Sequence, residues 1–82
     1  MYIVSGMVPA TSTTSATPEI LATFEKNSDA HKVLKIFNVL PEEEKFALKG
    51  KEIIVEIQEN DEEVQKTIKI RNKYTIMYVE EI

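Results

Sequence analysis

The feature that most constrains the fold is the alternation of apolar and polar residues between positions 51 and 71. A period of two is typical of β-strands with one buried face. The polar segment 59–62 interrupts the alternation and reads as a turn. The pattern therefore predicts strands at 51–58 and 64–71, joined as an antiparallel hairpin.

A turn of two or four residues around Asn60 and Asp61 sets the register of this hairpin, because a slip of one residue would invert every side chain. The residues that then share the core face are Ile53, Val55, Ile57, Val64, Ile68 and Ile70. Lys66 is the exception on this face, and we expect it near an edge where its ammonium reaches water. On the opposite face, Glu52 lies across from Lys69 as a cross-strand ion pair.

Residues 74–82 form the last predicted strand, and Asn72-Lys73 is the turn that would join it to the hairpin as a three-stranded antiparallel meander. A two-residue turn would put Tyr74, Ile76 and Tyr78 on the outer face. A three-residue turn would put them in the core and leave Met77 and Val79 outside. In either register this strand is apolar on both faces, so one face is expected to lack a cover within the chain.

The first half of the chain shows a strand and helices. Residues 1–8 have β-propensity and end at Pro9, and the serine- and threonine-rich segment 9–17 is expected to be a flexible loop. Thr17-Pro18-Glu19 has the composition of a helix start, which predicts a short helix through Phe24.

Two further helices follow from the spacing of apolar residues and from turn signals. Ala30, Val33, Leu34 and Phe37 have the helical spacing i, i+3, i+4, i+7, which predicts a helix over 29–39. Pro41 followed by three glutamates, with Gly50 as a C-terminal stop, predicts a one- or two-turn helix. The alternative is that residues 46–48 already begin a strand.

Together these elements predict a single small domain over residues 1–82, of the α+β class, with a short N-terminal strand, two or three short helices and then the meander, in the order β-α-α-β-β-β. A chain of this length has a small core, and it has no cysteine for disulfides. Good packing or self-association must then supply its stability, so a homodimer or higher oligomer is an expected state.

The residues that carry chemistry are sparse. His31 is the only histidine, and no cysteine is present, so neither a structural zinc site nor a catalytic constellation is predicted. With two glycines, the chain has no phosphate-binding loop. The acidic segment 59–63 lacks the spacing of a calcium loop and is interpreted as a solvated turn. We therefore expect no enzymatic activity, metal or cofactor.

The predicted function is that of a small protein-binding module, such as an adaptor, a regulator or inhibitor, or a subunit of an assembly. It would bind another protein or a second copy through an apolar sheet face and complementary charge. The candidate partner-binding residues are Lys69, Arg71, Tyr74, Ile76, Met77 and Tyr78. The alternative is single-stranded nucleic-acid binding by basic and aromatic residues on an exposed sheet, against which the net charge of −4 argues.

The sequence also bears on location. The start of the chain lacks the positive charge of a signal peptide, and no stretch approaches the roughly 20 apolar residues of a membrane span. A cytoplasmic protein without a membrane partner is the expectation.

Overall fold

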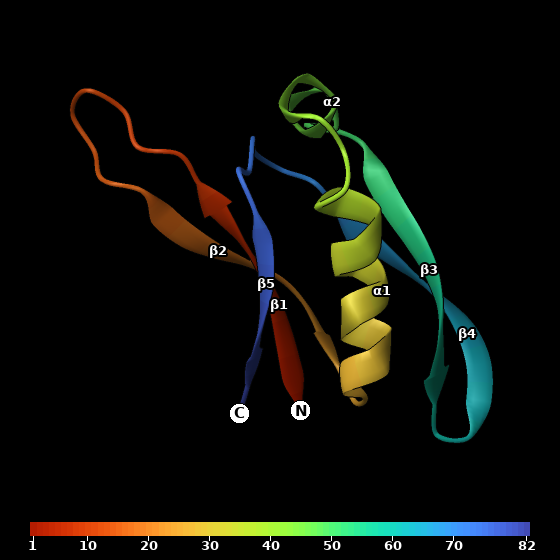
Figure 1. The fold of residues 1–82 in the computed structure, drawn as a ribbon. Coiled ribbons are helices and arrows are strands. Elements are labelled where there is room, and N and C mark those ends of the chain that lie inside the picture. Colours follow the sequence, from red (N-terminus) through yellow and green to blue (C-terminus); the bar gives the residue numbers. More distant parts are fainter.

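The computed structural model describes every residue from Met1 to Ile82 and belongs to the α+β class. Its elements are β1 (Tyr2–Val8), β2 (Thr17–Phe24), α1 (Asn27–Phe37), α2 (Glu42–Ala47), β3 (Glu52–Glu59), β4 (Glu62–Lys69) and β5 (Met77–Glu81). The strands form two antiparallel sheets, a three-stranded sheet in the order β2-β1-β5 and the two-stranded hairpin β3-β4. In Figure 1, α1 stands between the three-stranded sheet and the hairpin.

The β3–β4 hairpin confirms the predicted register. Ile57 pairs with Val64, Ile53 with Ile68, and Glu52 with Lys69. The two-residue loop is Asn60-Asp61, and both residues have positive φ values of 52° and 61°. This is the conformation of a type I′ turn, whose twist matches that of the two strands.

The predicted meander is wrong, because β5 does not pair with β4. The chain leaves β4 and crosses to the other sheet, where β5 pairs with β1 through partners from Tyr2–Glu81 to Gly6–Met77. Neither residue of Asn72-Lys73 has a positive φ, so no type I′ turn forms there. Neither of the two predicted registers therefore occurs.

The predicted helix at 17–24 is also wrong, because these residues form strand β2 beside β1. A β-bulge explains the misleading pattern. Val4 pairs with Ala22, whereas Ser5 pairs with Ile20, so Leu21 is the extra residue. The inserted Leu21 breaks the period of two and stands next to Ile20. With Phe24, the apolar residues then have the spacing i, i+1, i+4, which resembles one face of a helix.

The other two predicted helices are confirmed with small shifts in their bounds. α1 begins two residues earlier than expected and buries Ala30, Val33 and Phe37. α2 follows Pro41, and Gly50 comes shortly after it with a φ of 85°, a left-handed conformation that glycine adopts without strain. The alternative of a strand beginning at 46–48 is not adopted.

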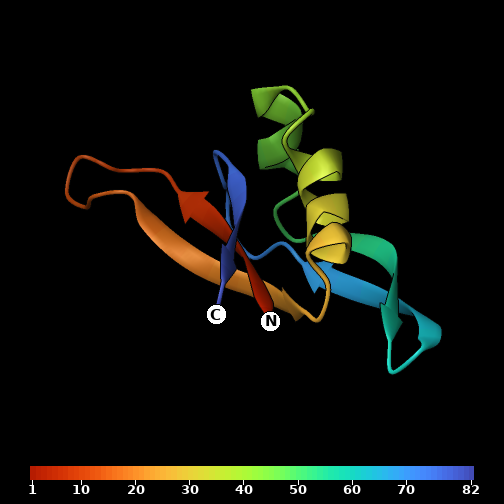
Figure 2. The same cartoon turned by 60° about the horizontal axis from the view of Figure 1, so that its bottom comes forward.

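The β1–β2 loop extends away from the rest of the protein (Figure 1). The whole chain, with this loop, measures 46 × 25 × 19 Å along its principal axes. Within the 9–17 segment, Thr17 is the first residue of β2, and Thr11 organises the loop through hydrogen bonds with Thr14. At the opposite end of the sheet the two termini lie side by side in both views (Figures 1 and 2), where the Ile82 N–H donates to the Met1 carbonyl.

The core lies between the sheet, α1 and the hairpin. Its buried apolar residues are Val4, Phe24, Ala30, Val33, Phe37, Ile53, Val55, Ile57, Ile68, Ile70, Tyr74 and Met77. Gly6 of β1 belongs to this core because the Tyr74 ring lies directly on it. A Cβ atom at Gly6 would stand 2.7 Å from two ring carbons. Tyr74 thus fixes the path of the crossover connection against β1.

Candidate binding surface

The three-stranded sheet has a face that points away from the core, and this face is largely apolar. Side chains alternate along a strand, so Ile3, Ser5 and Met7 point away from the side that Val4 and Gly6 occupy. We call this the outer sheet face. It is formed mainly by Ile3, Ser5, Met7, Ile20, Ile76 and Tyr78, with Pro18, Thr23 and Glu80 at its margins.

The three strands bring these residues together in register. Ser5 pairs with Ile20 of β2 on one side and with Tyr78 of β5 on the other. Ile76 precedes the inward-pointing Met77, and its carbonyl accepts a hydrogen bond of 2.9 Å from the Met7 N–H. Ser5 is buried by its neighbours, whereas Ile20 and Ile76 are 60% and 49% exposed.

No helix covers the outer sheet face. α1 packs against all three strands of the sheet from the core side, and both views show the other side without a helix (Figures 1 and 2). A shallow hollow of about 250 Å³ lies on this face, lined by Ile3, Ser5, Pro18, Ile20 and Glu80. An apolar sheet face without a cover is a typical feature of surfaces that contact another molecule.

A polar cluster around Glu19 secures the crossover connection on the core side of the sheet. The Glu19 carboxylate accepts hydrogen bonds from the Tyr74 hydroxyl at 2.9 Å and from the Asn72 amide at 2.6 Å. The Arg71 Nε atom lies 3.4 Å from the same carboxylate. Burial of the Tyr74 ring, together with this hydrogen bond and the nearby negative charge, raises the pKa of Tyr74 to about 12.

The six candidate partner-binding residues do not form one surface. Tyr74 and Met77 are fully buried in the core, whereas Ile76 and Tyr78 belong to the outer sheet face. Lys69 is exposed at the end of β4, in the hairpin. Arg71 is exposed but bonded to β2, because its Nη2 donates to the Ile20 carbonyl at 3.1 Å. Only Ile76 and Tyr78 therefore lie together on an uncovered face.

The basic residues near the hairpin contact the protein itself. The Lys66 ammonium donates to the Thr23 carbonyl and lies 4.8 Å from the centre of the Phe24 ring, so it is bonded to β2, whereas we expected it to reach water. The Lys73 ammonium lies 5.7 Å from the Phe46 ring. With Tyr74 buried, the aromatic and basic residues proposed as a nucleic-acid platform are not exposed side by side.

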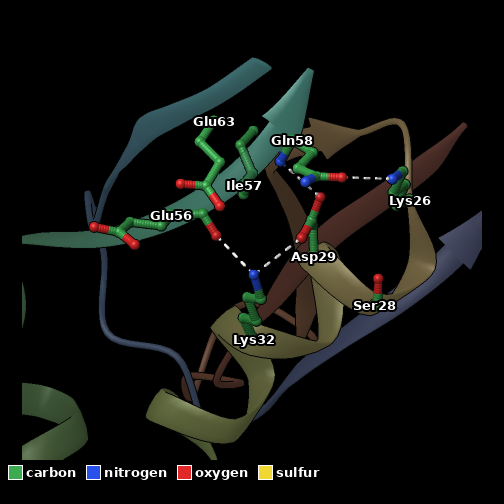
Figure 3. A pocket seen from close by; sticks show the side chains of 8 residues that line it. All are labelled: Lys26, Ser28, Asp29, Lys32, Glu56, Ile57, Gln58 and Glu63. Carbon is green, nitrogen blue, oxygen red and sulfur yellow. Dashed lines mark hydrogen bonds and ion pairs between the residues drawn. The ribbon is translucent and has the colours of Figure 1, made fainter. Parts of the chain in front are cut away.

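A polar notch of about 270 Å³ lies between the start of α1 and β3 (Figure 3). The buried Asp29 carboxylate accepts a hydrogen bond of 3.2 Å from the Gln58 N–H. It also forms an ion pair with Lys32. Lys32 also donates to the Glu56 carbonyl at 2.8 Å, and Lys26 donates to the Gln58 side chain. These contacts join α1 to the outer edge of β3, which gives the notch a structural role.

His31 lies on the exposed side of α1. Its Nδ1 is 3.0 Å from the Asn27 carbonyl of the preceding turn, and no carboxylate is hydrogen-bonded to it. A histidine that acts as a general base needs a positioned partner and a cleft, and His31 has neither. No group of three or more histidine or acidic side chains is arranged to hold a metal ion.

Side chains form hydrogen bonds to parts of the two outer edges of the three-stranded sheet. Arg71 and Lys66 bond the outward carbonyls of Ile20 and Thr23 in β2. Asn38, which follows α1, bonds Met77 of β5 twice, because its amide donates to the Met77 carbonyl at 2.9 Å and its oxygen accepts from the Met77 N–H at 3.0 Å. These contacts replace the strand partners that an edge otherwise lacks.

Sequence reasoning missed Ile3, Met7 and Ile20 as members of the outer sheet face. The first strand carries apolar residues at both odd and even positions, which is a signal that both of its faces meet apolar surroundings. The predicted helix at 17–24 includes Ile20 and therefore separates it from the residues of the first strand.

Neither helix is long and apolar enough to cross a membrane. Comparisons of the chain with protein-family models, with curated protein sequences and with solved structures found no match.

Proposed function

We propose that this chain is a small protein-binding module that acts through its outer sheet face and does not catalyse a reaction. The observation that carries the proposal is the exposure of Ile20 and Ile76 beside Ile3, Met7 and Tyr78, on an apolar sheet face that no helix covers. Burial of this apolar surface by a partner is favourable by about 25 cal/mol for each Å² removed from water.

The contrast with the other exposed sheet face supports this choice. The outward face of the hairpin carries Glu52, Glu56, Gln65, Thr67 and Lys69, with Ile54 as its one exposed apolar residue. Charged residues are depleted at the centres of protein interfaces, whereas aromatic residues and methionine are enriched. The outer sheet face has this composition and the hairpin face does not. A cytoplasmic location is part of the proposal, since a chain without cysteine suits a reducing compartment.

Site-specific photo-crosslinking in the source cell tests the proposal. Benzoylphenylalanine in place of Ile20 would lie on the proposed surface, beside Ser5 of the central strand, and the same group in place of Ile54 is a matched control with similar exposure, 60% against 56%. We expect a discrete protein adduct from position 20 and none from position 54. The mass of the adduct separates a second copy from a foreign protein.

Two results would contradict the proposal. Equal adducts from both positions would show that capture depends on exposure alone. No adduct from position 20, with the variant protein folded and expressed, would show that the outer sheet face has no stable partner.

A further inference from the structure

Strand β5 has backbone groups that no part of the chain satisfies. The bonds of Asn38 to the Met77 N–H and carbonyl show that Met77 directs its backbone groups away from β1. In an antiparallel pair this direction alternates along the strand, so Val79 and Glu81 also direct theirs outward. β5 pairs only with β1, and no side chain bonds Val79 or Glu81 from the open side.

The charges beside this edge define what can pair with it. Glu80 and Glu81 are exposed, and neither forms an ion pair within the chain, whereas Val79 is half-buried. A strand that pairs here would place its side chains about 5 Å from these residues, close enough for opposite charges to attract. The open edge therefore combines main-chain donors and acceptors with negative charge.

A second copy of this chain is a poor occupant of the same edge. Asn38 already takes the outward groups of Met77, so two copies could pair only through residues 79–81. An antiparallel pairing over these residues sets Glu80 of one chain opposite Glu80 of the other, with the two Glu81 side chains one position away, and like charges directly opposite destabilise a sheet.

We propose that the edge of β5 at Val79–Glu81 binds an extended, basic segment of a partner protein as an added strand of the sheet. Main-chain hydrogen bonds to Val79 and Glu81 would hold the segment, and its lysine or arginine side chains would pair with Glu80 and Glu81. An apolar residue of the segment would lie beside Val79. This inference rests on the proposed function, because the added strand extends the sheet whose outer face contacts the partner.

A nuclear magnetic resonance titration with a synthetic probe tests this inference. The probe is a seven-residue peptide of alternating lysine and valine, and a peptide with glutamate in place of lysine is its control. We expect saturable shifts of the Val79 and Glu81 amide signals, with slower hydrogen exchange at these two amides, and no such effect from the glutamate peptide.

Charge variants of the protein sharpen the test. The double variant Glu80→Lys/Glu81→Lys should weaken binding of the lysine peptide roughly tenfold, since two attractive pairs become repulsive. The double variant Glu62→Lys/Glu63→Lys changes the net charge equally at exposed positions of β4, and should alter the affinity by less than about twofold.

Several outcomes would overturn the inference. These are equal losses in both double variants, shifts confined to the outer sheet face, or no saturable shift of Val79 and Glu81 up to about 1 mM peptide. The photo-crosslink at Ile20 reports on the outer sheet face by itself. A cross-link at Ile20 without peptide binding at Val79 would therefore leave the proposed function standing and remove only this inference.

Discussion

The β3–β4 hairpin and the three-stranded sheet both contribute apolar residues to the core, but their strand pairings are specified in different ways. In the hairpin the two strands are neighbours in sequence, and the Asn60-Asp61 turn sets their register together with an alternation of apolar and polar residues that has exceptions only at Ile54 and Lys66. In the sheet, β1 pairs with β5 from the far end of the chain, and no local turn selects that pairing. The sheet instead depends on contacts such as Tyr74 on Gly6. Local signals therefore specify the hairpin, and tertiary contacts specify the sheet.

Alanine substitutions at the two glycines should give the largest difference in stability. Gly6 lies against a tertiary contact of the sheet, whereas Gly50 depends only on its own backbone conformation. Gly6→Ala would force a Cβ to within 2.7 Å of the buried Tyr74 ring, and should lower the free energy of unfolding by about 3 kcal/mol. Gly50→Ala meets no atom within 4 Å and suffers only from its φ of 85°, so it should cost about 1 kcal/mol. Urea unfolding of both variants measures the difference. A smaller loss for Gly6→Ala would mean that Tyr74 is not held against β1.

The hydroxyl of Tyr74 should make the sheet sensitive to alkaline pH. Its pKa is raised from 10.0 to about 12 in the folded protein, so the folded state keeps this proton longer than the unfolded chain does. The stabilisation is complete below pH 10 and is lost as the pH rises towards 12. The stability advantage of the wild type over Tyr74→Phe should fall by roughly 2 kcal/mol across this window.

Denaturant unfolding at a series of pH values measures that change. Tyr74→Phe keeps the ring on Gly6, so the comparison isolates the hydroxyl and its bond to Glu19. If the difference in free energy of unfolding between the wild type and Tyr74→Phe stays constant from pH 10 to 12, the Tyr74 hydroxyl ionises in the folded protein as it does in the unfolded chain.

Turn replacements give the smallest expected effect and test how local the hairpin is. Asp61→Gly should stabilise the protein by about 0.5 kcal/mol, because glycine adopts the φ of 61° without strain. Lys73→Gly creates the same Asn-Gly sequence in the crossover, where no such turn occurs, and should give no gain. Thermal unfolding of both variants decides the matter. A gain from Lys73→Gly would show that the crossover also depends on local turn preference.

The sequence correctly predicts the parts of the fold that depend on interactions between residues close to one another in the chain. The register of the hairpin, the α1 helix with its buried Ala30, Val33 and Phe37, and the short α2 helix all follow from spacing, turns and end signals. β2 was misread because its bulge at Leu21 imitates helical spacing. The meander prediction fails because adjacent strands usually pair, whereas the contacts that hold the crossover to the other sheet, such as those of Tyr74 with Gly6 and Glu19, join residues far apart in the sequence.

The candidate surface could be predicted only in part, for the same reason. The expectation that one face of the last strand lacks a cover agrees with the exposure of Ile76 and the partial exposure of Tyr78. The neighbours of these residues in the sheet depend on which strands pair, and that information is non-local. Lys69 and Arg71 were placed beside them only through the meander that does not form.

The pairing of β1 with β5 also has a consequence for the order of events during synthesis. β1 is made before the other strands and lies in the centre of its sheet, yet its second partner, β5, is made after β2, both helices and the hairpin. Until residues 77–81 have left the ribosome, one side of β1 has no strand to pair with, and Val4 lacks the neighbour that Val79 provides. Closing so long a loop is also slow for a chain of this size. The nascent protein thus passes through a stage with an open central strand, when it is most exposed to aggregation and to chaperones.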